Sequence, residues 1–227
     1  MKIRSLNELE DALDSELAWR KKELSTLNLS AKSLSKRDFP IHARAMVPLL
    51  YAHWEGFAKA ALTSYGVYVA TKQLPFDQLC RPLLYQELRA NFSRERTLTS
   101  GTLLAVVDCI DSANSKRFDR FPAERVDTSS NLNRENTTRE LGKLGLASDD
   151  LETLFPKLDA GLLDKRNRIA HGERLDVARD DLTELYELTH GLIARLDTVV
   201  RNSAAQNSFR RATYFADTAR PLQTAHP

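Results

Sequence analysis

The stretch from Pro40 to about Thr71, opened by Asp38 and Phe39, constrains the fold more than any other part of the sequence. Its apolar residues recur on nearly all sides of a helix, and Pro40 stands in the first turn, where a helix tolerates proline. At about 1.5 Å per residue such a helix would be roughly 45 Å long. A helix of this length that is apolar all round belongs at the buried centre of a domain, so we predict that the other helices pack around it.

The rest of the chain also shows helical rather than strand periodicity. Ser5 followed by Glu8 forms a capping box, which opens an amphipathic helix extending to about Ser30. Leucines at helical spacing indicate a last helix from Arg179 to about Arg201. Because no alternating apolar pattern persists anywhere, we predict an all-α bundle of about six to eight helices around one long central helix. The other predicted helices are Phe76–Arg94, Thr99–Ser115, Asn133–Leu144 and a segment ending at His171.

Length and composition predict a single globular domain. The chain has 227 residues, of which 42% are hydrophobic and 28% charged, typical of a folded protein with one core. We expect the domain to cover residues 1–201, followed by a small, polar and flexible C-terminal tail over residues 202–227. The formal net charge of +2 neither indicates nor excludes a nucleic-acid partner.

Several features argue against a secreted, membrane or metal-dependent protein. Cys80 and Cys109 lie far apart without a nearby histidine pair, which favours free thiols over a disulfide or a zinc site. The most apolar segment is interrupted by His53, Glu55 and Lys59, so we expect no membrane span. The N-terminus turns acidic where a signal peptide would need an apolar core. We therefore expect a cytoplasmic protein without metal or other cofactors.

A dense polar cluster stands at the end of one predicted helix. Arg166, Asn167 and His171 form the pattern R-N-x-x-x-H, and Gly172 follows at once as a helix stop. A histidine can act as general base or acid near neutral pH, and an arginine binds a phosphate whose negative charge grows in a transition state. Without metal ligands, the two suit transfer of an RNA phosphodiester to its own 2′-hydroxyl.

The spacing within this motif raises a geometric question. On an ideal helix Arg166 and His171 point about 140° apart, whereas Asn167 and Arg168 share a face with His171. We therefore assign Asn167 to orienting His171. Either the helix loosens before Gly172, or Arg166 reaches round it, or a second copy of the chain completes the site. A second copy would also supply a second histidine, since one histidine cannot be base and acid at once.

Structural roles can explain the same residues. A histidine at a helix C-terminus favours the helix dipole, and Arg166 can pair with an acid such as Asp164 or Glu173. In the long central helix, Glu55 and Lys59 stand four residues apart, the spacing of an ion pair on one helix face.

Four segments resemble the HEPN superfamily, in particular its bacterial MAE_28990/MAE_18760-like members. In chain order they are YAHWEGFAKAAL (Tyr51–Leu62), VDTSSNLN (Val126–Asn133), LGKLGL (Leu141–Leu146) and LLDKRNRIAHG at the motif. The resemblance covers roughly Ser5 to Val200. It implies a HEPN-like helical bundle and a metal-independent endoribonuclease with Arg166, Asn167 and His171 as catalytic residues, leaving a 2′,3′-cyclic phosphate.

The resemblance also implies partners. RNA is the expected substrate, with Arg168, His53, Glu55 and Lys59 as candidate substrate-binding residues. The chain is expected to form a homodimer, or a heterodimer with a related HEPN protein, with two motifs across one cleft. A toxin, phage-defence or RNA-processing role follows, with an antitoxin as a neutralising partner. The alternative is a non-catalytic HEPN module for dimerisation or for binding a nucleotide or partner protein.

Overall fold

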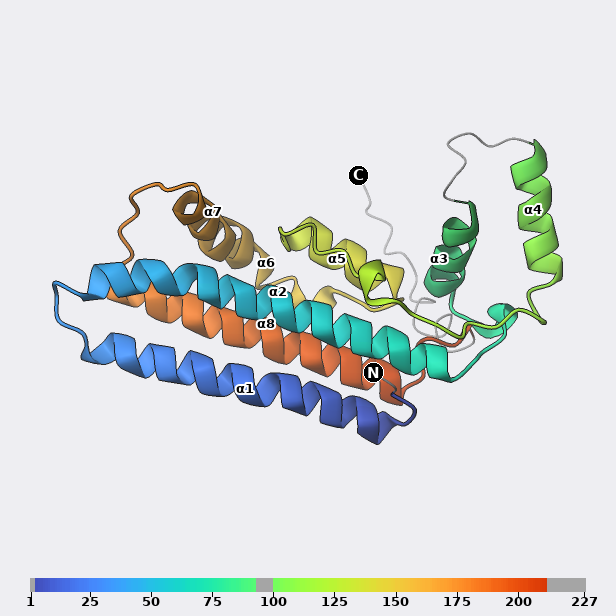
Figure 1. Ribbon diagram of the computed structural model, residues 1–227, viewed down its shortest axis with the longest axis horizontal. Helices are drawn as coiled ribbons and strands as arrows, with labels where there is room; N and C mark the ends of the chain where they lie inside the picture. The colour runs from blue at the N-terminus through green and yellow to red at the C-terminus, as the bar shows by residue number, and fades with distance from the viewer. Residues whose placement is uncertain (1–2, 93–99, 212–227) are drawn as a thin grey trace, which may run out of the picture.

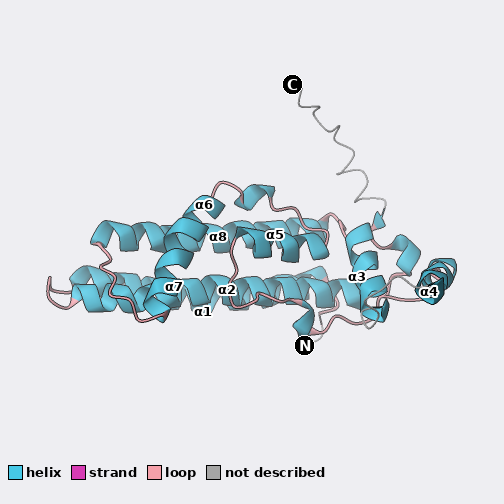
Figure 2. Cartoon of the chain, turned by 90° about the horizontal axis from the view of Figure 1, so that it is seen from above, coloured by secondary structure: helices cyan, strands magenta, loops and turns pink. Residues whose placement is uncertain are grey.

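The computed structural model describes residues 3–92 and 100–211, which form an all-α structure (Figures 1 and 2). The described residues contain no strand and seven helices when the continuous segment from Phe155 to Ala170 is counted as one. The predicted fold class and helix number are therefore confirmed. The α-helices are α1 (Leu6–Ser33), α2 (Phe39–Thr71), α3 (Arg81–Phe92), α4 (Ser100–Asp111), α5 (Arg134–Lys143), α6 (Phe155–Lys157), α7 (Asp164–Ala170) and α8 (Arg179–Ala205).

Helix α2 is the centre of the molecule, as its sequence predicts. Helices α1 and α8 lie along it, while α5 and the segment from α6 to α7 lie on its other side (Figure 1). Its aromatic side chains Trp54, Phe57 and Tyr65 are completely buried. None of the helices in the described ranges combines the length and apolarity needed to cross a membrane.

Local capping signals place the helix ends as predicted. The Ser5 hydroxyl accepts a hydrogen bond from the Glu8 N–H at 3.1 Å, which begins α1. Asn133 caps α5 in the same way, through the Asn136 N–H at 2.8 Å. Helix α5 is followed by Gly145 at φ +72°, a left-handed conformation that glycine adopts without strain.

The region after α2 departs from the predicted helix Phe76–Arg94. A short 3-10 turn at Phe76–Gln78 is followed by extended backbone, because the Cys80 N–H donates to the Phe209 carbonyl at 2.8 Å. Helix α3 therefore begins only at Arg81, and residues 93 and 94 lie outside the described ranges. Beyond them, α4 exposes four large apolar side chains by 50–65%: Leu103, Leu104, Val107 and Ile110.

The C-terminal boundary of the domain needs a correction. We expected a flexible tail from residue 202, but α8 continues to Ala205 and Phe209 is completely buried. The Phe209 ring packs edge-on against Tyr68, with 6.0 Å between the ring centroids. Because this packing removes a large apolar side chain from water, residues 202–211 belong to the folded domain. The rest of the expected tail, residues 212–227, lies outside the described residues.

Candidate active site

The motif lies at the end of one continuous helical segment that starts at Phe155. The middle of this segment, Leu158–Leu163, is a π-helix, in which the Asp164 N–H donates to the Asp159 carbonyl five residues back. The regular turns of α7 follow and end at His171. Gly172 then adopts φ +82°, so the predicted helix stop is confirmed. The wide π-turn therefore lies before the motif, and Arg166 and Asn167 stand in regular α-helical turns.

This segment crosses the layer of long helices from α8 to α2. Its first half packs on α8 beside a cavity of about 380 Å³ lined by Gly161, Lys165 and Leu185, and α7 packs on α2 (Figure 2). The crossing places Arg166 over Tyr51 of α2, with the guanidinium carbon 4.7 Å from the centre of the ring. A cation–π contact of this kind stabilises by about 0.5–2 kcal/mol and fixes the plane of the guanidinium.

Tyr51 also fixes the loop that precedes α5. Its hydroxyl accepts a hydrogen bond from the Leu132 N–H at 2.6 Å, and the Trp54 indole N–H donates to the Leu132 carbonyl at 3.3 Å. Burial raises the pKa of Tyr51 to about 12, and the nearby Glu55 carboxylate raises it further. The hydrogen bond from the Leu132 N–H lowers this pKa, but by less than burial raises it. Tyr51 therefore stays a neutral phenol at physiological pH.

Arg166 keeps its charge available on the surface of α7. Its Nη1 donates to the Asn167 side-chain oxygen at 2.8 Å. The acids expected to neutralise it are held by Arg168 instead, which lies 2.8 Å from Glu173 and 3.9 Å from Asp164. No carboxylate forms an ion pair with Arg166 in the part of the chain that the structure describes. The Tyr51 ring and the Asn167 side chain thus position the Arg166 guanidinium, and its remaining N–H groups can bind an anion.

The contact made by Asn167 differs from the role we assigned to it. Its side chain lies against Arg166, whereas its link to His171 is only the helical hydrogen bond from the His171 N–H to the Asn167 carbonyl, 2.9 Å. The His171 side chain is exposed at the end of α7. In this structure Asn167 orients the arginine of the motif rather than the histidine.

The three candidate residues of α2 do not form one group. Glu55 is half-buried and close enough to the Tyr51 hydroxyl to interact with it, and Lys59 is exposed one turn further on. Among the residues that the structure describes, Glu55 and Lys59 do not form the expected ion pair. Glu55 lies next to Tyr51 instead. Glu55 and Lys59 therefore stand on the same side of α2 as Tyr51.

His53 points the other way, into the interface with α1. Its Nε2 lies 3.4 Å from the Glu23 carboxylate, and its ring lies 5.3 Å from that of Trp19. Burial lowers the pKa of His53, and the Glu23 carboxylate only partly opposes this. Two residues along a helix correspond to about 200°, so His53 cannot share the face of Tyr51. The expectation that His53 binds substrate at the motif does not agree with this position.

Sequence reasoning missed Tyr51, although it brings the motif, the loop and Glu55 together. It is one of many aromatic or apolar residues on a helix that is buried almost all round, so it does not stand out. The available signal was its spacing of four residues from Glu55, which puts both on one helix face.

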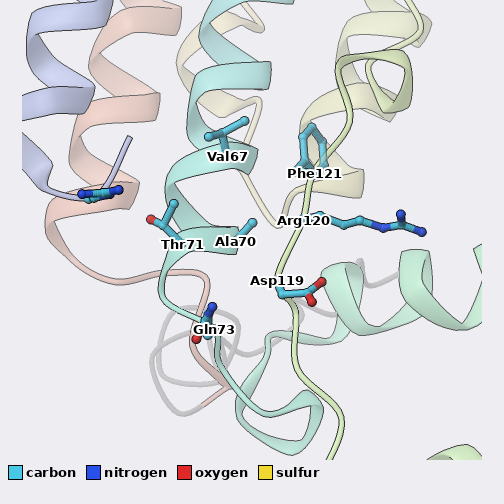
Figure 3. A pocket seen from close by; sticks show the side chains of 8 residues that line it. Val67, Ala70, Thr71, Gln73, Asp119, Arg120 and Phe121 are labelled. Carbon is cyan, nitrogen blue, oxygen red and sulfur yellow. The ribbon is translucent and has the colours of Figure 1, made fainter. Parts of the chain in front are cut away.

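A larger cavity, of about 610 Å³, lies at the other end of α2 (Figure 3). The side chain of Arg120 extends away from Ala70 and Thr71 there, and the Thr71 hydroxyl donates to the Ile3 carbonyl at 2.7 Å. Its polar groups do not converge on one point, so we do not assign a catalytic site to it. In the described ranges, no group of three or more His, Cys, Asp or Glu side chains is placed to hold a metal ion.

The all-α bundle and the R-N-x-x-x-H motif at a helix end define a HEPN-type domain. The family described as RiboL-PSP-HEPN matches residues 15–202, which is most of the chain, and the chain belongs to this family. The match confirms the HEPN resemblance, through the RiboL-PSP family rather than the MAE_28990/MAE_18760-like one. The searches of curated proteins and of solved structures found no match.

Proposed function

We propose that this protein is an endoribonuclease that cleaves RNA without a metal ion and leaves a 2′,3′-cyclic phosphate and a 5′-hydroxyl. The observation that carries the proposal is the Arg166 guanidinium, stacked on Tyr51 and held by Asn167. A planar guanidinium binds two phosphate oxygens at once and stabilises the charge that grows on them during cleavage. Membership of a HEPN family supports the same class of activity.

The other cationic and titratable residues around the motif have supporting roles in this proposal. His171, exposed at the end of α7, carries a proton to or from the reacting oxygens. Arg168 on α7 and Lys59 on the exposed side of α2 contact the RNA backbone, because its phosphates attract cations. Asn167 holds the plane of the Arg166 guanidinium through its side-chain oxygen.

We also propose that two copies, or one copy and a related HEPN chain, pair through the exposed flank of α2. Ile41, Ala45, Leu49 and Ala52 recur there every three or four residues, and Ile41 and Leu49 are 77% and 40% exposed. An apolar stripe on the surface of a central helix is typical of an interaction face. Pairing there would bring two motifs towards one cleft. A toxin or phage-defence setting, with an antitoxin as a further partner, is what the HEPN resemblance suggests.

The test is cleavage of a labelled RNA by the purified protein, with and without EDTA. We expect cleavage to survive EDTA, the products to carry 2′,3′-cyclic phosphates, and His171→Ala to lose the activity while it keeps its circular dichroism spectrum. Loss of activity in EDTA, or products with 5′-phosphates, would contradict the proposed mechanism. Sedimentation of the wild type and of Leu49→Lys tests the pairing, since a charge on the stripe should favour the monomer.

A further inference from the structure

The C-terminal end of α2 is surrounded by cations that have no part in the motif. Arg4, Lys116, Arg117 and Arg120 are exposed there, and Lys72 is half-buried among them; together they are called the basic surface below. None of the five forms an ion pair with a residue in the ranges 3–92 and 100–211. Positive charge is therefore concentrated here, although the formal net charge of the whole chain is only +2.

Hydrogen bonds to backbone oxygens bring these cations together without neutralising them. The Lys72 Nζ donates to the Arg4 carbonyl at 3.1 Å, which ties the end of α2 to the residues before α1. The Arg117 Nη1 donates to the Gln73 carbonyl at 3.4 Å, which holds the segment after α4 against the same end. Both acceptors are uncharged, so both side chains keep their full positive charge. Asp119 is the acid that lines the cavity at this place.

The cavity of about 610 Å³ gives the basic surface its shape (Figure 3). Val67 and Ala70 of α2 form one side of it, and Phe121 forms the other. Arg4 and Arg120 line it as well and are exposed. The lining thus combines apolar side chains, which suit the ribose and base of a nucleotide, with guanidinium groups, which suit phosphate oxygens. Because the cations are spread out rather than gathered on one point, they suit a linear polyanion better than a compact anion.

Helix α2 connects the basic surface to the motif. Three helical turns separate Lys59 from Ala70, and at about 100° per residue the two point within about 20° of each other. Arg166 lies over Tyr51, two turns before Lys59 on a neighbouring face of the same helix. At a rise of about 1.5 Å per residue, Ala70 is about 28 Å from Tyr51 along α2. One extended strand can therefore run from the motif past the exposed Lys59 to the cavity.

We infer that the basic surface binds the backbone of the RNA strand at a distance from the bond that is cleaved. The inference rests on the proposed ribonuclease function and adds a second contact region for the same substrate. Each phosphate that a cation neutralises releases counterions, so this surface contributes affinity rather than rate, and it does so for any sequence. An acidic protein segment would also be attracted to these cations, but the alignment with Lys59 and the motif favours a strand that reaches all of them.

Binding can be measured apart from cleavage with a single-stranded 2′-O-methyl RNA, which lacks the attacking hydroxyl. Arg117→Gln/Arg120→Gln removes two exposed charges of the basic surface, and Lys21→Gln/Lys22→Gln removes two exposed charges of α1 as the matched control. Fluorescence anisotropy at several salt concentrations gives the slope of log Kd against log salt. We expect this slope to fall by about 1.4 in the first variant, about 0.7 for each lost phosphate contact, and to stay unchanged in the control.

Cleavage of two substrates of different length gives a second readout. A long single-stranded RNA can reach the basic surface, whereas a dinucleoside phosphate at the motif is too short to do so. We expect Arg117→Gln/Arg120→Gln to raise KM several-fold on the long RNA with kcat unchanged, and to cleave the dinucleoside phosphate as the wild type does. Thermal melting of the variant within a few degrees of the wild type excludes a folding defect.

The outcomes distinguish the inference from the function on which it rests. A wild type that binds RNA through the basic surface but cleaves neither substrate would overturn the proposed function and leave the inference standing. If Arg117→Gln/Arg120→Gln keeps the slope and KM of the wild type, or if the control loses as much, the inference is wrong. Equal losses on both substrates would also contradict it, because the effect would then be at the motif. Poly-glutamate that binds only with Arg117 and Arg120 intact, while RNA binding does not depend on them, would assign the surface to an acidic protein instead.

Discussion

The two faces of α2 around residues 53–56 both carry polar groups, but they meet different neighbours. On one face Trp54 holds the Leu132 carbonyl, and Glu55 lies beside Tyr51 and the motif. On the opposite face His53 lies against α1, away from solvent. A costly polar residue in a buried helix is therefore no sign of function by itself. The two faces differ in what surrounds the polar group. Glu55 lies near the surface on the side of Tyr51 and Arg166, whereas His53 lies in the closed interface with α1.

The α1 face is closed by an unusual arginine. Arg20 is only 5% exposed; it pairs with Glu16 and stacks on Trp19, with 4.2 Å from its guanidinium carbon to the ring centre. Gly56 makes room for it, because a Cβ there would lie 3.1 Å from the Arg20 Nη2. The Nδ1 of His53 and the Nε of Arg20 are buried without a hydrogen-bond partner among the described residues. These groups give α1 a specific position on α2 rather than a reactive site.

The largest effect should come from removing an aromatic anchor on either face. Trp54→Ala and Phe57→Ala should each lower the free energy of unfolding by about 3–5 kcal/mol, since both rings are completely buried. Urea denaturation measures this loss. Activity per folded molecule should fall only in Trp54→Ala, because of these two rings only Trp54 forms a hydrogen bond with the loop at Leu132. Equal activity losses in the two variants would mean that the faces are not functionally distinct.

Arg166 should matter for rate and little for stability. We expect Arg166→Ala to lower kcat by about 10²–10³-fold, as for loss of one stabilising donor, and to lower the free energy of unfolding by no more than about 2 kcal/mol, the largest value for its contact with Tyr51. Arg166→Lys should recover part of the rate, since an ammonium keeps the charge but not the planar fork. Rate measurements on RNA and a melting curve check both statements. A large loss of stability would assign Arg166 to packing instead.

Tyr51→Phe sharpens the comparison at a single oxygen atom. The ring remains under Arg166, but the Leu132 N–H loses its acceptor, which should cost about 1–3 kcal/mol of stability. The rate should fall less than in Arg166→Ala, because the guanidinium keeps its platform. Denaturation and RNA cleavage measured on the same sample test both parts. A variant as stable as the wild type would show that water replaces the hydroxyl.

The smallest expected effect concerns the α1 face. It is a change in the free energy of unfolding that appears only at acidic pH. Burial lowers the pKa of His53 and of His190. Below about pH 6.5 the unfolded chain binds protons that the folded chain resists, so the free energy of unfolding should fall as the pH falls. The charged groups that modify the pKa of His53 are Glu23 and Arg20, and those that modify the pKa of His190 are Glu187 and Lys21. Urea unfolding at pH 7.5 and 5.5 should show a smaller difference in His53→Gln; an unchanged difference would contradict the assignment.

The parts of the fold that depend on local patterns could be predicted from the sequence. The apolar surface of α2, the Ser5 cap and the Gly172 stop each act within a few residues, and each was confirmed. The start of α3 could not be predicted, because it is set by pairing of Cys80 with Phe209, far away in the sequence. Long-range pairing of this kind leaves no periodic signal.

The candidate site shows the same division. Arg166, Asn167 and His171 stand close together in the sequence, so their spacing alone drew attention to them. Tyr51 comes to Arg166 through the crossing of two helices, and that crossing depends on packing across the bundle. Which side chain Asn167 contacts likewise depends on this crossing.

The π-helix at Leu158–Leu163 has a consequence for how this chain can vary. It holds one residue more in its turn than the α-helix that follows. Loss of one codon here would therefore leave an ordinary α-turn, and Arg166 and His171 would keep their direction relative to the buried Phe155 upstream. The same deletion between Arg166 and His171, in the regular turns of α7, would change the angle between these two side chains by about 100°. Changes in length are therefore tolerated better in the π-turn than inside the motif.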